Sequence, residues 1–416
     1  MRETVGFTML RRHTYTIGLL LAVAILLAQP DAMAATSDVA AAASELVYIG
    51  THGTGGGPPS AAPASVGQAQ AKESAVQGIY VARLDRKTGH LTALGLGAEL
   101  QRATWLLGHP TLPVIYSVAD SGGGMEANSL IYSYSVDRAS GKLQLLNKVD
   151  AGGRDATALS LDAPSATLFS ANHGSGDVSA LPLQADGSLG SMASIQKDYG
   201  TGPHPRQKNP QAHGVAVDPT HKYALVADFG ADRIFVYHFN GATRALTLAQ
   251  VPFESLPAGS GPRHLIFHPN GQFLLVDTEL TAELRSYRWD AKQGQLHLVQ
   301  TLAAYPADAT GEKSAAEIAF SSDGRFAYLS LRGDQDSIIV YAVNRRSGSL
   351  REIQRIPAQG KAPWSFGIDP SGRWLLVTNE SSDAVAEFAL DPASGKLRAT
   401  AESLSIPKPV TVVFMR

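Results

Sequence analysis

The 416-residue sequence contains no cysteine, so neither a disulfide nor a thiolate metal site can form. No sign of charge dominates either, since 35 Lys and Arg residues stand against 37 Asp and Glu residues. Without a basic stripe, we expect no nucleic-acid partner. The 12 histidines show no HExxH motif or paired metal spacing, so we expect no metal. Nothing in the sequence calls for a cofactor.

What the chain does have is a repeated hairpin pattern. The stretch Gly261–Gly271 (GPRHLIFHPNG) gives a short apolar strand and a turn, and a second strand follows it. Similar hairpins recur at 214–228, 318–330 and 366–379, with a spacing of about 50 residues. A hydrophobic content of 44% is ample for a core, and 40 glycines suit a chain rich in turns. Such spacing is typical of a β-propeller.

The repeats can be counted as four-stranded blades. Six complete blades are predicted to start near residues 102, 154, 211, 261, 314 and 362. The N-terminal segment supplies three strands of one more blade, and Pro409–Met415 (PVTVVFM) is a lone strand. Pairing the two would close the ring and remove the exposed sheet edges. The prediction is an all-β, seven-bladed β-propeller over residues 45–416, which we expect to be monomeric.

The N-terminal segment is typical of export. Residues 1–34 contain a basic start, the apolar stretch Ile17–Ala28 and the small-residue motif Ala32-Met33-Ala34. We expect a cleaved signal peptide, with an uncleaved anchor as the alternative, then a spacer over 35–44. Residues 53–78, rich in Gly, Pro, Ala and Ser, are predicted to be a flexible loop. The mature protein is predicted to be periplasmic or secreted, without membrane contact.

Repeat counting also locates a candidate site. In a blade, the start of the innermost strand and the end of the second strand lie at one face, beside the central channel. His213 and Arg263 occupy the first of these positions, and Glu279 and Arg332 occupy the second. Two guanidinium groups suit an anionic group, and a carboxylate with an imidazole could move protons. The alternative is that Arg263 and Glu279 form only a structural ion pair.

Further residues are predicted to contribute to substrate binding. Some occupy equivalent or adjacent positions in other blades, and two lie in the loop Gly202–Asn209, which enters the complete blade that starts near residue 211, on the same face. For His264 the alternative is a structural histidine, and for the loop it is a solvated surface. The candidates are His264, Asp120, His173, Glu380, His204 and Arg206.

Together, GPRHLIFHPNG, AHGVAVDP with VADFGADRIFVY, AAEIAFSSDGRFAYLSLRG and FGIDPSGRWLLVTN resemble the seven-bladed lactonase family. Its best-known activity is 6-phosphogluconolactonase, and it includes fungal carboxymuconate cyclases. The resemblance implies that the residues acting in the cyclase branch, one His, two Arg and one Glu, correspond to His213, Arg263, Arg332 and Glu279. Trp364 and Ser365 stand where Arg-Asn is usual in the family.

These observations predict a lactone hydrolase acting on a sugar-derived or other acidic lactone. Arg263 and Arg332 would hold the anionic group or the developing oxyanion. Glu279 would position or deprotonate water, and His213 would protonate the leaving oxygen or share the base role. The alternatives are a lactonizing cyclase of the carboxymuconate type and a non-catalytic ligand-binding propeller. Export also predicts an unphosphorylated lactone, because phosphorylated sugars should not be abundant outside the cytoplasm.

Overall fold

The predicted hairpins are formed by antiparallel strands joined by tight turns. In the hairpin around Gly271, β16 (Pro262–Phe267) pairs with β17 (Phe273–Thr278). Gly271 adopts a positive φ of 70°, which glycine tolerates without steric cost. The amide of His268 donates to the carbonyl of Phe273 and closes the turn. Local turn chemistry therefore sets the register of the hairpin.

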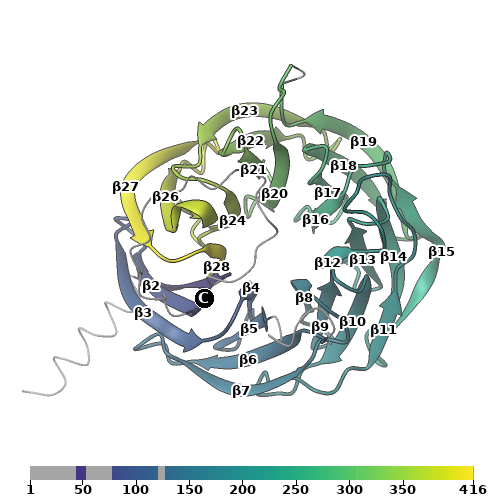
Figure 1. Cartoon of the computed structure of the whole chain (residues 1–416), viewed down its shortest axis with the longest axis horizontal. Helices are drawn as coiled ribbons and strands as arrows, with labels where there is room; N and C mark the ends of the chain where they lie inside the picture. Colours follow the sequence, from purple (N-terminus) through teal and green to yellow (C-terminus); the bar gives the residue numbers. More distant parts are fainter. Residues whose placement is uncertain (1–43, 53–76, 120–126, 307, 416) are drawn as a thin grey trace, which may run out of the picture. The chain divides into compact units, whose positions relative to one another are not determined.

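A computed structural model describes residues 44–52, 77–119, 127–306 and 308–415, which form seven four-stranded antiparallel sheets (Figure 1). We number these sheets as blades in chain order and give their strands from the channel outward. Blade one contains β28 (Pro409–Met415), β1 (Ser44–Thr51), β2 (Gly78–Asp85) and β3 (Leu91–Glu99). Blade two contains β4 (Ala103–Gly108), β5 (Val114–Ala119), β6 (Leu130–Val136) and β7 (Leu143–Asp150). Blade three contains β8 (Ala156–Asp162), β9 (Thr167–Asn172), β10 (Asp177–Pro182) and β11 (Ser194–Lys197). Blade four contains β12 (Ala212–Val217), β13 (Tyr223–Asp228), β14 (Arg233–Asn240) and β15 (Ala245–Ser255). Blade five contains β16, β17, β18 (Glu283–Asp290) and β19 (Gln295–Ala303). Blade six contains β20 (Lys313–Phe320), β21 (Phe326–Gly333), β22 (Ser337–Val343) and β23 (Leu350–Pro357). Blade seven contains β24 (Pro363–Ile368), β25 (Trp374–Asn379), β26 (Ala384–Leu390) and β27 (Leu397–Ser405), with a short 3₁₀ helix at Glu380–Ser382.

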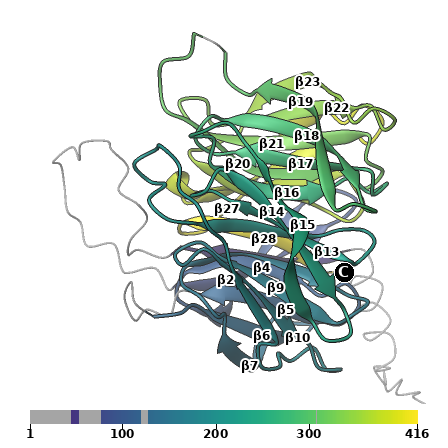
Figure 2. The ribbon, with the colours of Figure 1, turned by 90° about the vertical axis from the view of Figure 1, so that its right-hand side faces the viewer.

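The predicted ring closure is confirmed. Strand β28 pairs antiparallel with β1, with Leu46 opposite Met415 and Gly50 opposite Thr411. The last strand of the chain thus becomes the innermost strand of the first blade, and Figure 2 shows the blades from the side. Two predicted boundaries differ by one residue. Ser44, predicted to end the spacer, is the first residue of β1 and pairs with Asp85 of β2, and Gly78, predicted to end the flexible loop, is the first residue of β2.

Each innermost strand carries an irregularity near its start. In every blade the register between the innermost and second strands shifts by one residue at this point. A β-bulge of this kind redirects side chains and is common next to active sites. The shifts fall at or next to the repeat positions of His213 and Arg263 and their equivalents in the other blades, which are Thr104, Thr157, Ala316 and Trp364.

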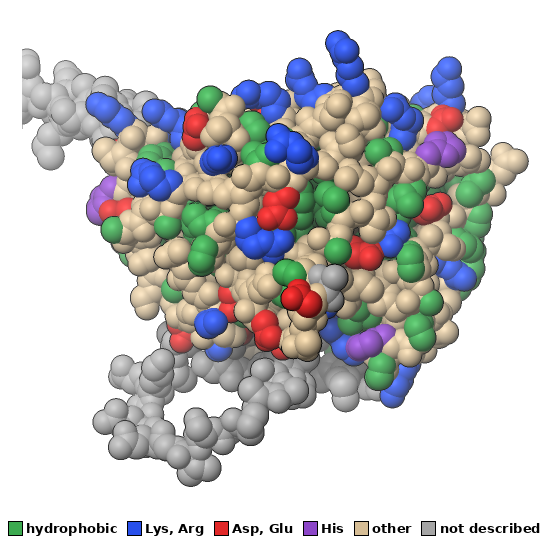
Figure 3. Space-filling model, turned by 90° about the horizontal axis from the view of Figure 1, so that it is seen from above, with side chains coloured by type: hydrophobic (Ala, Val, Ile, Leu, Met, Phe, Trp, Pro, Cys, Tyr) green, Lys and Arg blue, Asp and Glu red, His purple; other side chains and the backbone are tan. Residues whose placement is uncertain are grey.

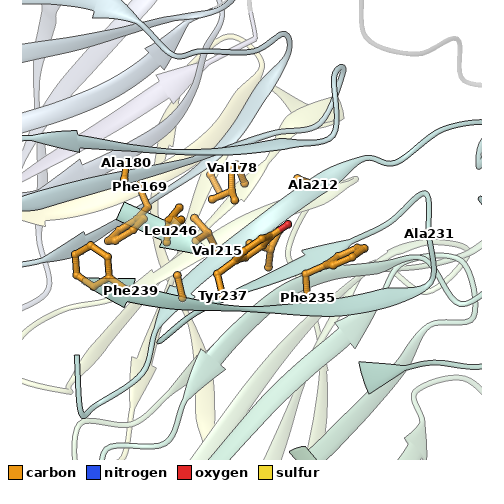
Figure 4. Close-up of a cluster of buried hydrophobic side chains, with 14 residues drawn as sticks. Phe169, Val178, Ala180, Ala212, Val215, Ala231, Phe235, Tyr237, Phe239 and Leu246 are labelled. Carbon is orange, nitrogen blue, oxygen red and sulfur yellow. The ribbon is translucent and has the colours of Figure 1, made fainter. Parts of the chain in front are cut away.

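The hydrophobic core is divided among the junctions between blades. Figure 4 shows the cluster between blades three and four, where Phe169 of β9 meets Phe239 of β14 edge to face at 4.9 Å. Similar clusters fill the other junctions, seven in all in the described residues. Burying a large apolar side chain such as Phe169 contributes about 2–3 kcal/mol. Because the core lies at the junctions between blades, the side chains at the channel-facing positions are not needed to form it.

Residues 41–416 form one unit, and the predicted signal peptide over 1–34 lies outside the described residues, as does most of the predicted loop over 53–78. Figure 3 shows the rim of the propeller, where charged side chains of both signs are spread among hydrophobic ones. None of the helical segments in the described part of the chain is long and apolar enough to span a bilayer.

Candidate active site

Three arginines converge on one carboxylate at the start of β16. Arg263 Nε lies 3.1 Å from Glu279 Oε2, and Arg332 Nη2 lies 3.1 Å from the same oxygen. Arg206 Nη1 lies 2.7 Å from the other oxygen, Oε1. We call Arg206, Arg263, Arg332 and Glu279 the arginine cluster. The ion pair between Arg263 and Glu279, which could have been a purely structural pair, is thus part of a larger cationic group.

Each member of the cluster comes from a different structural element. Arg263 sits at the bulge of β16, and Glu279 follows the end of β17 in the same blade. Arg332 is the second-last residue of β21, as its predicted position at the end of the second strand requires. Arg206 reaches in from the loop Gly202–Asn209, between blades three and four. The cluster forms only when the ring brings these elements together.

The charges of the cluster do not cancel. Arg263, Glu279 and Arg332 are 3%, 7% and 9% exposed, whereas Arg206 is exposed at the surface. Burial raises the pKa of Glu279, but Arg332, Arg263 and Arg206 outweigh this effect and lower it to about 2. The carboxylate is therefore ionised at neutral pH and leaves an excess of positive charge around it. Such a site favours an anion, because guanidinium groups bind carboxylates and phosphates through paired hydrogen bonds.

His213 lies beside the cluster as a neutral imidazole. Burial, the positive charge of Arg263 and the neighbouring His264 and His173 lower its pKa well below the ordinary value of 6.5. Its Nδ1 atom is buried and has no hydrogen-bond partner among the described residues. The ring contacts His264 and His173 edge to face, with centroids 5.2 Å and 5.4 Å away. A buried ring nitrogen without a partner is available to a ligand in the channel.

Aromatic rings lie against all three arginines of the cluster, and two of these contacts are close. Trp364, at the bulge of β24, lies under Arg332 with the guanidinium carbon 4.4 Å from the ring centroid. Arg206 lies over Phe229 at 4.6 Å. Cation–π contacts of this kind hold a guanidinium group without using its hydrogen-bond donors. In this chain Trp364, at a position where the family that the sequence resembles usually has Arg, therefore packs against the neighbouring Arg332.

The loop that carries Arg206 is anchored by a buried glutamine. Gln207 Nε2 donates to Phe229 O and to Asp232 Oδ1, both at 2.7 Å. Its Oε1 accepts the backbone amide of His204 at 3.1 Å. These bonds fix the loop where Arg206 can reach Glu279.

The other predicted substrate-binding residues have different outcomes. His173 lies against His213, and His264 contacts both His213 and Arg263, so the structure brings these two to the site. His204 instead accepts the backbone amide of Arg206 at Nδ1 and shapes the loop. Glu380 pairs with Lys408 at 3.5 Å. Asp120 lies outside the described residues.

Sequence reasoning missed Glu317, Asp277 and Gln207. Glu317 Oε1 lies 3.1 Å from His264 Nδ1, and Asp277 Oδ1 accepts the backbone amide of His264 at 2.8 Å. Glu317 directly follows Ala316, one of the positions found by repeat counting, so extending the count by one residue would have found it. Gln207 lies in a loop outside the repeat, where no count reaches. Among the described residues, no group of three His, Asp or Glu side chains is arranged to hold a metal ion.

Comparison with known proteins places this geometry in a family. Residues 64–414 match the family described as Lactonase, 7-bladed beta-propeller. A 6-phosphogluconolactonase of Bacillus subtilis is 33% identical over 341 residues, which cover 82% of this chain and 95% of the relative. A second 6-phosphogluconolactonase, from Formosa agariphila, is 28% identical over 79% of this chain and 93% of its own length.

A solved structure points the same way. The periplasmic gluconolactonase of Pseudomonas aeruginosa superposes with a TM-score of 0.80 at 31% identity, covering 90% of this chain and 99% of the other. With a family match over most of its length and relatives that it spans almost completely, the chain belongs to the seven-bladed β-propeller lactonase family.

Proposed function

We propose that this protein hydrolyses a sugar-derived or other acidic lactone. The observation that carries the proposal is the convergence of Arg206, Arg263 and Arg332 on the single carboxylate of Glu279. Hydrolysis of a lactone develops negative charge on the carbonyl oxygen in the transition state. Donors already fixed in place stabilise such charge without reorganising during the reaction.

The residues would divide the chemistry as follows. Arg263 and Arg332 hold the anionic group of the substrate or the developing oxyanion, and Arg206 adds a third positive charge from the loop. Glu279, with its pKa of about 2, is a weak base and serves mainly to hold the guanidinium groups in position. His213 is neutral and offers its ring to the leaving oxygen as a hydrogen-bond partner. The substrate would thus be oriented by charge and handled by neutral groups.

An unphosphorylated lactone is the preferred substrate in this proposal. Residues 1–34 have the pattern of an export signal, and phosphorylated sugars should not be abundant outside the cytoplasm. The structural relative from Pseudomonas aeruginosa is a periplasmic gluconolactonase, which supports a location outside the cytoplasm for this chain too. A plain aldonolactone or a carboxylated lactone fits both the location and the arginines.

A lactone panel tests the proposal. The full chain is assayed by pH-stat titration with a plain aldonolactone, its 6-phosphate and a carboxylated lactone, each corrected for spontaneous hydrolysis. We expect catalysis, with a higher kcat/KM for one of the unphosphorylated lactones than for the phosphate. A strong preference for the phosphate would overturn the substrate assignment. Binding of these lactones without turnover would instead identify a ligand-binding propeller.

Matched arginine variants test the role of the cluster. Arg263→Lys keeps one charge but loses the fork of donors, so we expect kcat to fall roughly 100-fold, as for loss of an oxyanion donor. Arg285→Lys is the control, because Arg285 is also buried and paired with a glutamate, Glu283, but lies on β18 outside the cluster. Equal effects of the two substitutions would show that the cluster has no special role in turnover.

A further inference from the structure

A second arc of polar side chains runs around the channel, one residue beyond the bulge in three neighbouring blades. His264 of β16, Glu317 of β20 and Ser365 of β24 form it, and we call it the channel arc. His264 Nδ1 lies 3.1 Å from Glu317 Oε1, and Ser365 Oγ donates to Glu317 Oε2 at 3.0 Å. The innermost strands that carry the arc lie side by side around the centre of Figure 1. Both oxygens of one carboxylate are therefore used to fix one imidazole.

The backbone beneath each member of the arc is fixed from the second strand. The amides of His264, Glu317 and Ser365 donate to side chains of β17, β21 and β25 respectively. The acceptors are Asp277 Oδ1 at 2.8 Å, Ser330 Oγ at 3.0 Å and Thr378 Oγ1 at 3.1 Å. Three different side chains thus make the same contact in three blades. This repetition shows that the arc occupies a rigid position on the scaffold.

The hydrogen-bonding partners determine the tautomer of His264. Burial raises the pKa of Glu317, but His264, Ser365 and Arg263 outweigh this and lower it below its ordinary value, so the group is an ionised carboxylate. An ionised carboxylate can only accept, so His264 Nδ1 must carry the hydrogen. The lone pair of the neutral ring is then on Nε2, 3.2 Å from Arg263 Nη1. A carboxylate on one ring nitrogen and a lone pair on the other is the arrangement of a general base. Arg263 Nη1 lies almost equally far from the two ring nitrogens, 3.1 Å from Nδ1 and 3.2 Å from Nε2, so it lies against the ring and not on the axis of the Nε2 lone pair.

The surroundings of His264 connect it to the arginine cluster and to solvent space. Arg263 bridges the two groups, with Nε on Glu279 and Nη1 next to His264. The charged or titratable groups that face the imidazole are Arg263, Asp277, Glu317 and His213.

A cavity of about 370 Å³ in the channel is lined by His264 and Glu317 together with side chains of the inner strands β4, β8, β12 and β16. A cavity of this size has room for several water molecules beside the imidazole. The pair is therefore buried in protein yet adjacent to space that water can occupy.

Close approach of the neighbouring strand depends on a glycine. A Cβ atom on Gly214 of β12 would lie 2.6 Å from Arg263 O and 3.2 Å from His264 Cα. Only glycine permits this spacing, which lets His213 and His264 meet at the channel.

We propose that His264 accepts the proton of the attacking water and that Glu317 is the positioning residue that holds it for this task. This inference rests on the proposed lactonase function and adds the base that Glu279 is poorly suited to be. The water oxygen bonds to the lactone carbonyl carbon, and its proton passes to Nε2 of His264. The ring C–O bond then breaks, and the proton returns to the departing ring oxygen. Lactone and water give a hydroxy acid with no other reactant.

Glu317→Gln in the full chain tests the positioning role. The amide keeps the shape but removes the charge, so we expect kcat to fall at least tenfold, with KM changed less than about twofold, because general-base catalysis contributes about 10²–10⁴ in rate. Glu317→Asp restores the charge and should recover part of kcat, which a purely structural role of the side chain would not predict.

His264→Gln should lower kcat by about 100-fold or more. Glu387→Gln is the matched control, since Glu387 is a buried glutamate on β26 that takes no part in the channel arc, and it should keep the wild-type kcat and KM. Thermal unfolding of each variant separates loss of fold from loss of chemistry.

The outcomes distinguish this inference from the proposed function. If the wild type hydrolyses lactones while Glu317→Gln keeps the wild-type kcat, the inference is wrong and the proposed function stands. If the wild type is inert on the whole lactone panel, both are overturned. A second readout does not need turnover: ¹⁵N chemical shifts should show Nδ1–H on His264 in the wild type, and an Nε2–H tautomer would contradict the assignment.

Discussion

At the scale of single residues, Glu279 shows how one side chain can define a site by charge balance. It neutralises only one of the three guanidinium groups around it, so the remaining charge is available to a ligand. A carboxylate held in this way is more useful for fixing its partners than for taking a proton. The same contacts determine how the stability of the fold depends on Glu279 in acid.

Glu279 should stabilise the fold at neutral pH and lose this effect in acid. Its pKa of about 2 in the folded protein lies below the ordinary 4.5, so the unfolded chain binds the proton more readily. The resulting contribution, on the order of 3 kcal/mol, is complete above about pH 4.5 and disappears as the pH falls through about 2. Urea unfolding of Glu279→Gln should therefore show a large deficit at pH 7 that narrows toward pH 3.

The control for this prediction is Glu352→Gln, which breaks an exposed pair with Arg355. Exposed pairs contribute roughly 0–1 kcal/mol, so this variant should remain close to the wild type throughout. A deficit for Glu279→Gln that stays constant between pH 7 and pH 3 would contradict the assignment of the effect to its charge.

Arg206 should affect substrate binding more than the chemical step. It is exposed and belongs to a loop, so Arg206→Ala removes one charge without opening a cavity. We expect KM for an anionic lactone to rise about tenfold, the effect of one charge-assisted hydrogen bond, with kcat little changed. A neutral lactone should be affected much less. Arg233→Ala is the control, because Arg233 also stacks on aromatic rings, Tyr199 and Phe253, but on the rim.

Single residues were predictable from the sequence where the repeat supplied a coordinate. His213, Arg263, Glu279 and Arg332 each occupy a fixed offset from a turn, and the structure brings three of them into one cluster with His213 beside it. Glu380 was selected by the same offset, but it pairs with Lys408, because an offset says where a residue lies and not which partner it finds.

At the scale of elements, the strands were predictable because every hairpin combines apolar strands with explicit turn residues. The bulges were not, since a register shift leaves no mark in the spacing of apolar residues. Their presence explains why the residue after Arg263 also faces the channel, and why Glu317 escaped a count that took one position per strand. Loops lie outside the repeat altogether, so the contact of Arg206 with Glu279 could not be foreseen.

The loop Gly202–Asn209 should behave as a unit with its anchor. Gln207→Ala removes the bonds to Phe229 O and Asp232 and leaves buried groups unpaired, which should cost about 1–3 kcal/mol. It should also raise KM for an anionic lactone about as much as Arg206→Ala does. Because both act through the position of one guanidinium group, the double variant should have nearly the KM of either single variant. Additive effects on KM would show that the anchor and the arginine act independently.

At the scale of the whole molecule, the junction between blades seven and one contains a carboxyl group that titrates near neutrality. Burial and the nearby Glu402 raise the pKa of Glu387 to about 7, although a hydrogen bond from Thr400 opposes the shift. Glu387 is 1% exposed, and a Cβ atom on Gly89 of blade one would lie 2.9 Å from it. Ionisation of Glu387 therefore places a buried negative charge in this junction, which destabilises the folded protein.

The sign of this effect is opposite to that for Glu279. The folded state holds the proton more tightly than the unfolded chain, so the penalty is absent below about pH 4.5 and complete above about pH 7. Its size is roughly 1–3 kcal/mol. Glu387→Gln should match the wild type in thermal stability at pH 5 or below and exceed it at pH 8. Equal melting temperatures of Glu387→Gln and the wild type at pH 8 would show that the buried charge does not destabilise the fold.

The closing strand β28 should be essential for the fold. Deleting residues 409–416 would leave β1 as an unpaired edge and uncover the buried side chains of Val47 and Ile49. Open edges invite association between chains. We expect the truncated protein to lose cooperative unfolding and to aggregate, as measured by calorimetry and light scattering. A monomeric truncation product with a cooperative transition would show that the other six blades are stable by themselves.

Because β28 is the innermost strand of blade one, the propeller begins and ends its chain in the same sheet. A ribosome makes that strand after every residue of the arginine cluster and the channel arc has already emerged or entered its exit tunnel. Blades two to seven can fold during synthesis, at about 5–20 residues per second, but the circle they belong to cannot yet be completed. We therefore expect a polypeptide stalled just before β28 is made to hold all of these side chains and still lack the enclosed channel that makes them a site.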